Sequence, residues 1–135
     1  MSHEPSSPAG ATDAHQVAGA PLPLITDEMM RGRLSQAQAY TAVLLRATSK
    51  LVRPDVDAII WEHGRRNMAL AEHGVLAIVL PVGDDTELAG LAVFDCDVAQ
   101  ATEIMTHDPG VQAGIFTFET HPVRGFPGAT LPARP

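Results

Sequence analysis

The sequence predicts an α+β fold in which helices cover one face of an antiparallel sheet. Short apolar runs that are typical of strands alternate with two segments that carry helix start and stop signals. One of these runs, "VLAIVLPV" (75–82), is apolar throughout. A run of this kind predicts a strand that is buried on both faces, so the sheet must have covering layers on its two sides.

The first half of the predicted domain is a strand followed by a long helix. "YTAVLLR" (40–46) has the composition of a strand. Pro54 suits the first position of a helix, and Asp55 suits the positively polarised first turn. We expect the helix to run to about Glu72 and to end at Gly74, because glycine readily adopts the left-handed conformation that closes many helices.

The second half is predicted to hold two strands, a second helix and a last strand. Asp97 can cap the second helix, because Gln100 stands at the third position of a capping box. The predicted segments are, in order, 75–82, 88–95, 98–107 and 114–123. The resulting order, β-α-β-β-α-β, is the ferredoxin-like plan.

The ends of the chain differ in composition from this core. Residues 1–25 are rich in Pro, Ala, Ser and Gly and lack apolar periodicity, which is typical of a flexible tail. Thr26 can cap an added helix at about 27–38, within a domain that spans 26–123. Residues 124–135 are expected to form a C-terminal tail. No secretory signal is visible, and no apolar run reaches the ~20 residues of a membrane helix, so we expect a cytoplasmic protein.

Composition limits the classes of partner. The chain has 135 residues, which suggests one domain, and its net charge of −7 comes from 9 basic and 16 acidic residues. Binding to nucleic acid needs clustered Lys and Arg, so we do not expect nucleic acid as a partner. Because no apolar run reaches the length of a membrane helix, we do not expect a membrane as a partner either. Cys96 is the single cysteine, so no intrachain disulfide can form. Its neighbours Asp95 and Asp97 would raise the pKa of its thiol, which makes it a poor nucleophile.

The strand at 75–82 also predicts an oligomer. Alternate residues point to opposite faces, and both sets are apolar: Val75, Ala77 and Val79 on one face, and Leu76, Ile78 and Leu80 on the other. Two helices cover only one face of the sheet. A partner's sheet or the N-terminal helix must cover the second face, and we expect a homodimer that packs sheet against sheet.

Two polar residues lie inside the apolar stripe of the first helix. On a helical wheel, His63 and Asn67 fall near the centre of a stripe made by Val56, Ile59, Ile60 and Leu70. Arg66 lies at the edge of the stripe, and Trp61 and Met68 form a separate apolar patch. Burial without a partner would cost ~1–3 kcal/mol for each polar residue. His63 and Asn67 therefore either find partners in the core or line a wet pocket.

A carboxylate near His63 would orient its ring for acid/base chemistry. The candidates are Asp84, Asp85, Asp108 and Glu119. Asp108 precedes Pro109, a pair that is ordinary at a helix start. Glu119 is a charge within a predicted strand, so it either points to water or belongs to a polar pocket. The sequence has no CxxC, HExxH or P-loop motif, and we expect neither a metal ion nor an organic cofactor.

Three segments carry a family resemblance: "YTAVLLR", "EHGRRNMALAEHGVLAIVLPV" and "GLAVFDCDVAQATEIMTHDPGVQAGIFTFETHP". They resemble the YCII-related (YciI-like) family of the dimeric α+β barrel superfamily over roughly residues 40–122. The most specific part is "DPGVQAGIFTFETHP". The resemblance implies a ferredoxin-like protomer and a dimer that pairs two sheets. It also implies an active-site pair made by the helix histidine and the aspartate of the DP step, here His63 and Asp108.

The resemblance implies a small cofactor-free enzyme of the isomerase, lyase or dehydrochlorinase type, acting on a small cyclic or carbonyl compound. One described activity in the family removes chloride from a chlorinated hydroxyhydroquinone. We expect Asn67, Arg66 and Glu119 to bind the substrate. Two other interpretations stay open, namely a non-catalytic module that binds a small molecule and a structural dimeric partner. The N-terminal segment and the ending "GFPGATLP" depart from short family members, and either could reshape the pocket mouth.

Overall fold

The chain consists of two compact units, which divide between Ser35 and Gln36. The computed structural model describes residues 14–135. In the first unit, strand β1 (Gln16–Val17) pairs with β2 (Ala20–Pro21), and helix α1 (Asp27–Ser35) follows. Thr26 caps α1 by accepting a hydrogen bond from the Met29 N–H at 3.1 Å, which confirms the predicted cap.

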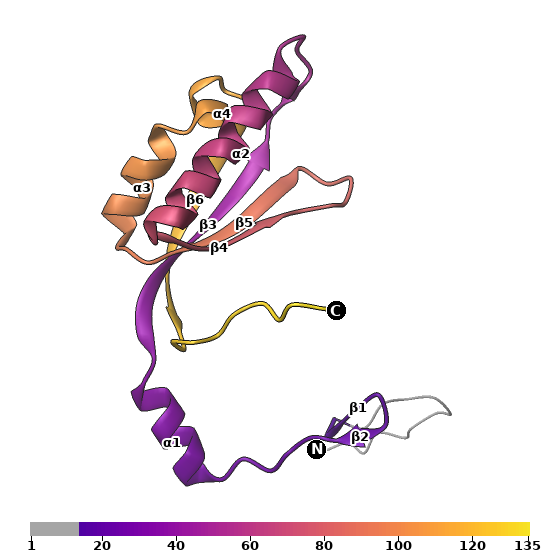
Figure 1. The fold of residues 1–135 in the computed structure, drawn as a ribbon, viewed down its shortest axis with the longest axis vertical. Coiled ribbons are helices and arrows are strands. Elements are labelled where there is room, and N and C mark those ends of the chain that lie inside the picture. Colours follow the sequence, from indigo (N-terminus) through magenta and orange to yellow (C-terminus); the bar gives the residue numbers. More distant parts are fainter. Residues whose placement is uncertain (1–13) are drawn as a thin grey trace, which may run out of the picture. The chain divides into compact units, whose positions relative to one another are not determined.

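The second unit has the predicted ferredoxin-like fold. Its sheet has the strand order β4-β5-β3-β6 with every neighbouring pair antiparallel, and the helices lie on one face (Figure 1). Its elements are β3 (Gln38–Ala47), a 3-10 turn η1 (Ser49–Leu51), α2 (Val56–His73), β4 (Leu76–Pro81), β5 (Leu88–Phe94), α3 (Val98–Thr106), α4 (Pro109–Gln112) and β6 (Phe116–Gly125). No helix between residues 14 and 135 is long and apolar enough to cross a membrane.

The helix signals are confirmed except at the start of α2. Gly74 closes α2 with a φ of 98°, and its N–H bonds to the carbonyls of the last turn. Asp97 caps α3 by accepting from the Gln100 N–H at 2.8 Å. The helix α2 begins at Val56, two residues after Pro54, and Asp55 makes no side-chain cap. The reason is that the carboxylate of Asp55 binds the guanidinium of Arg53 instead.

Strands β3 and β6 are longer than predicted. Strand β3 begins at Gln38 and β6 ends at Gly125, and these two residues are the first pair of a ten-residue ladder. Each strand is longer because its partner supplies hydrogen bonds to the additional residues. The sequence of one strand alone does not show where its partner ends. The start of β6 is displaced to Phe116, because Gly114 has a φ of 78° and belongs to the turn after α4.

The core lies between α2, α3 and the inner face of the sheet. Alternate β3 residues, Thr41, Val43 and Leu45, are buried there. Strand β4 follows this alternation only in part, since its register with β5 shifts between Leu76 and Ile78. The shift places Leu76 opposite Phe94 but Ile78 opposite Val93, so the two residues lie on opposite faces. The predicted shared face of Leu76 and Ile78 is therefore wrong, because a bulge adds one residue to the strand.

Candidate active site

His63 and Asp108 form a hydrogen-bonded pair between helix α2 and the start of α4. The Nδ1 atom of His63 lies 2.7 Å from Oδ1 of Asp108. The Asp108 side chain is fully buried, and that of His63 is 14% exposed. The two residues are 45 positions apart in the chain, so the pair forms only when the two halves of the domain dock.

Asp108 uses its second oxygen to hold the backbone of α4. Oδ2 accepts hydrogen bonds from the N–H groups of Gly110 at 2.9 Å and Val111 at 3.2 Å, with Pro109 at the first helical position. Asp108 is thus a helix cap, as its place before Pro109 indicates, and its other oxygen still binds His63. A carboxylate oxygen only accepts, so Nδ1 carries the hydrogen of that bond, and in the neutral form of the ring Nε2 then has a lone pair.

Phe116 and Gly110 support the pair from the side of β6 and α4. The ring of Phe116 is buried and packs against His63, with centroids 5.1 Å apart and planes tilted by 53°. A side chain on Gly110 would place its Cβ 2.4 Å from Cδ2 of Phe116, so only glycine fits there. Both residues lie in the segment "DPGVQAGIFTFETHP", but neither was predicted for the site, because their contact depends on how the turn between α4 and β6 places the two elements.

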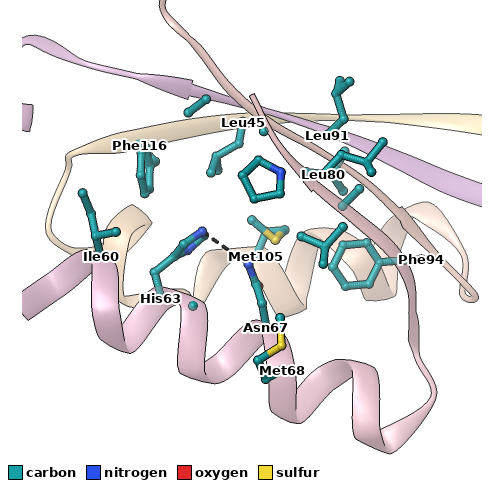
Figure 2. A pocket seen from close by; sticks show the side chains of 17 residues that line it. Leu45, Ile60, His63, Asn67, Met68, Leu80, Leu91, Phe94, Met105 and Phe116 are labelled. Atoms are coloured by element: carbon teal, nitrogen blue, oxygen red, sulfur yellow. Dashed lines mark hydrogen bonds between the residues drawn. The ribbon is translucent and has the colours of Figure 1, made fainter. Parts of the chain in front are cut away.

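A pocket of about 400 Å³ lies beside His63 (Figure 2). Among the described residues that line it, His63 and Asn67 are the polar ones. The other lining residues are Val43, Leu45, Ile60, Gly64, Met68, Val79, Leu80, Pro81, Ala89, Gly90, Leu91, Ala92, Phe94, Met105 and Phe116. An apolar pocket of this size with a few polar groups is typical of small-molecule sites.

Asn67 lies one helical turn after His63 and faces the same pocket. Its Nδ2 atom lies 3.3 Å from Nε2 of His63, the contact drawn as a dashed line in Figure 2. An amide N–H that points at Nε2 agrees with a lone pair on that nitrogen. The structure therefore brings together three of the residues predicted for the site, His63, Asp108 and Asn67.

Arg66 is not brought to this pocket. It precedes Asn67, and successive residues of a helix point about 100° apart around the axis. Its Nη1 atom is buried and has no hydrogen-bond partner among residues 14–135. Arg66 is also missing from the described residues that line the pocket, so the structure gives it no contact with the site.

Glu119 lies on the other face of the sheet. Glu119 is paired with Leu44 of β3, which alternates with the buried residues Val43 and Leu45. Paired residues point to the same face of a sheet, so the Glu119 side chain points away from the helices. There it bonds to His121 at 2.8 Å and to Arg46 at 3.0 Å. The hydrogen bond from His121 holds the pKa of Glu119 below its ordinary value, and the charge of Arg46 adds to this effect.

Other chemistry has little support in the structure. Within residues 14–135, no group of three or more His, Cys, Asp and Glu side chains is placed to hold a metal ion. Burial raises the pKa of the Cys96 thiol, and the charges of Asp97 and Asp95 add to it. The expected effect of the two acidic neighbours is confirmed, although burial is the larger cause. Cys96 is accordingly a weak nucleophile.

Comparison with known proteins gives a distant structural likeness. No family model matches the chain, and no curated protein matches it. Among solved structures, the chain is similar to 5-chloro-2-hydroxyhydroquinone dehydrochlorinase from Burkholderia phenoliruptrix AC1100, in complex with 2,5-dihydroxybenzoquinone. The identity is 11% and the TM-score is 0.44, over 61% of this chain and 90% of the other.

Proposed function

We propose that the protein is a YciI-like, cofactor-free enzyme in which His63 acts as acid and base on a small cyclic or carbonyl compound. The observation that supports this most is the 2.7 Å bond between Nδ1 of His63 and the fully buried Asp108, beside an open pocket. A histidine that is oriented by a carboxylate in this way is a recurrent acid/base device. A positioned group of this kind contributes about 10²–10⁴-fold to a rate.

The reaction begins with proton abstraction by Nε2. Because Asp108 holds the Nδ1 hydrogen, the lone pair of Nε2 takes a proton from a carbon next to a carbonyl. The electron pair of the C–H bond moves into the substrate. In an isomerisation, the proton returns from Nε2 to a different carbon. In an elimination, a double bond forms, and a leaving group such as chloride departs with its electron pair.

Asn67 would then serve as the polar contact for the substrate. Its amide lies close to Nε2, so a substrate whose acidic C–H reaches Nε2 also places its oxygen near Asn67. The remaining wall of the pocket is apolar, which favours a neutral ring or a short apolar group. A substrate with several charges would lose hydration there without compensation.

The direct test is hydrogen–deuterium exchange into candidate substrates, followed by proton NMR in D₂O. A panel of cyclic ketones and unsaturated lactones reports proton abstraction without knowledge of the final product. We expect the wild type to exchange at least one compound and His63→Gln to be at least about 10²-fold slower. His73→Gln, at the exposed end of the same helix, is the matched control and should keep the wild-type rate. A wild-type rate in His63→Gln would disprove the assignment.

A non-catalytic binding module is the second candidate. It is favoured by the Asn67 amide, whose Nδ2 lies 3.3 Å from Nε2 of His63 and would compete with a substrate for its lone pair. In that case compounds from the same panel would raise the melting temperature of the wild type, and would raise it less in His63→Gln. No compound would exchange deuterium faster than in buffer. Binding with exchange supports the enzyme, and binding without exchange supports the module.

We also propose a homodimer that pairs the uncovered faces of two sheets. Leu44, Leu91 and Leu80 lie opposite one another across β3, β5 and β4, and the next row holds Ala42, Val93 and Ile78. Leu91 is 37% and Leu80 36% exposed in the single chain. An apolar sheet face of this kind is typical of an interface. Leu44→Lys should shift sedimentation from dimer to monomer, whereas Ala99→Lys, on the exposed side of α3, should not.

A further inference from the structure

Gly64 occupies the middle of helix α2, directly after His63. A glycine inside a helix makes the helix less stable than alanine would. Gly64 does not have a positive φ, and a Cβ at this position would meet no atom within 4 Å. Neither backbone conformation nor packing within the described chain therefore requires glycine here. Gly110 is the contrasting case, since the Phe116 ring excludes a side chain there.

The open space above Gly64 lies where two hollows meet. One is the pocket beside His63, and the other is a groove of about 530 Å³ on the outer side of α2. Both are lined by Ile60, Gly64 and Met68. Because Gly64 lines both hollows and a Cβ there would meet no atom within 4 Å, no side chain separates them at this position.

The groove presents an apolar platform beyond this connection. Trp61 is 69% exposed and Met68 57% exposed, although large apolar side chains are normally covered. Of the two charged residues that line it, Arg65 is already paired with Glu62 at 3.2 Å, and Asp57 lies one turn before Trp61. An indole face and a flexible thioether suit an apolar chain or a second ring.

We infer that the groove is a second subsite for an elongated neutral ligand. The polar ring of the ligand lies at His63 and Asn67, and its apolar arm crosses Gly64 and lies on Trp61 between Ile60 and Met68. Placement of the ring rests on the proposed function, whereas placement of the arm rests on Gly64 and the groove. Gly64 is then a specificity residue: it makes helix α2 less stable than alanine would, and it leaves room for the arm of the ligand to reach the groove.

The test uses the full chain and three probes: phenol, para-ethylphenol and para-hexylphenol. Affinities come from titration calorimetry. Trp61 is the single tryptophan of the sequence, so its emission locates the arm. Burial of each CH₂ group is worth up to about fourfold in affinity, and a partly buried hexyl arm should bind at least about tenfold more tightly than the ethyl arm. The hexyl compound should shift the Trp61 emission, and phenol should not.

Gly64→Ala separates access from stability. We expect a higher melting temperature and loss of the tenfold gain in affinity of para-hexylphenol over para-ethylphenol. Gly32→Ala is the matched control, because Gly32 is also a helical glycine with open space above it and lines neither hollow. That variant should gain stability and keep the wild-type affinities. Trp61→Ala should also lose the gain for the hexyl arm.

Three results would overturn the subsite. In the first, Gly64→Ala binds para-hexylphenol as tightly as the wild type does. In the second, the affinity of the wild type does not depend on the length of the arm, which includes the case that no probe binds. Trp61→Ala could instead convert a dimer to a monomer, which would assign the groove to a second copy of the chain. The proposed function fails separately, through deuterium exchange that does not depend on His63.

Discussion

Replacement of Asp108 by Asn should separate the fold from the chemistry of the His63 site. Asparagine keeps one carbonyl oxygen, which can accept the Gly110 and Val111 hydrogen bonds, and it caps helices as well as aspartate. Its NH₂ group then faces Nδ1 of His63 and can only donate. Nδ1 must therefore become the acceptor, and the ring hydrogen moves to Nε2.

The magnitudes follow from the contacts that each variant keeps. Asp108→Asn keeps the helix cap and makes the bond to His63 a neutral one, which costs about 1 kcal/mol of unfolding free energy. Asp108→Ala removes the helix cap, worth about 1 kcal/mol, and leaves the buried Nδ1 hydrogen of His63 without an acceptor, worth about 1–3 kcal/mol. The alanine variant should therefore lose roughly 2–4 kcal/mol.

Two measurements test this reasoning. Urea denaturation gives the unfolding free energies of the wild type, Asp108→Asn and Asp108→Ala. Nitrogen-15 NMR of the imidazole shows which ring nitrogen carries the hydrogen. We expect Nδ1–H in the wild type and Nε2–H in Asp108→Asn. We also expect Asp108→Asn to lose turnover, since the same change in a Ser-His-Asp triad lowers turnover about 10⁴-fold.

The reasoning fails if the asparagine variant is as unstable as the alanine variant, because the cap would then depend on the charge. It also fails if His63 of the asparagine variant keeps its hydrogen on Nδ1. A variant with the reversed tautomer and full turnover would refute the role of Nε2 as base while leaving the hydrogen-bond geometry intact.

Three further predictions concern the surroundings of the site. Gly110→Ala should lose about 1–3 kcal/mol in urea denaturation because its Cβ overlaps the Phe116 ring, and Gly83→Ala, which has open space, should change stability by less than about 0.5 kcal/mol. Iodoacetamide should label Cys96 more slowly at pH 8 than it labels the thiol of free cysteine, because the raised pKa of Cys96 lowers its thiolate fraction. The labelling rate of Cys96 should increase as pH rises, and equal rates for the two thiols at pH 8 would contradict the raised pKa. Thr41→Val should cost about 1 kcal/mol, since the buried Thr41 hydroxyl donates to the Cys96 carbonyl at 2.8 Å; an unchanged midpoint would show that this bond adds nothing.

The order of elements was predictable because its signals are local. A cap such as Asp97 or a closing glycine such as Gly74 acts within one turn of its own helix, so the sequence around it contains the whole cause. Strand length depends on the partner, and the extension of β3 to Gln38 follows from its pairing with Gly125. The bulge in β4 could not be predicted either, because residues 75–82 are an uninterrupted apolar run in which no residue indicates its position.

The candidate site was predictable only in part, for a similar reason. The helical period places His63 and Asn67 on the inner side of α2, and the family resemblance selects Asp108 among four carboxylates. Glu119 was expected near the substrate, but it points to the opposite face of the sheet, since a strand alternates with a period of two and its phase is set by pairing. Phe116 could not have been predicted, because its contact with His63 depends on how two elements dock.

Asp108 binds both His63 and the backbone of α4, so amide exchange at the start of α4 reports on the His63 site. The amide hydrogens of Gly110 and Val111 exchange with solvent only when they leave Oδ2, and that event loosens the carboxylate whose other oxygen binds His63. Their exchange rates therefore measure how often the site comes apart, separately from global unfolding. A ligand that slows these two amides, without slowing those of the central strands, acts on the local opening of α4 alone.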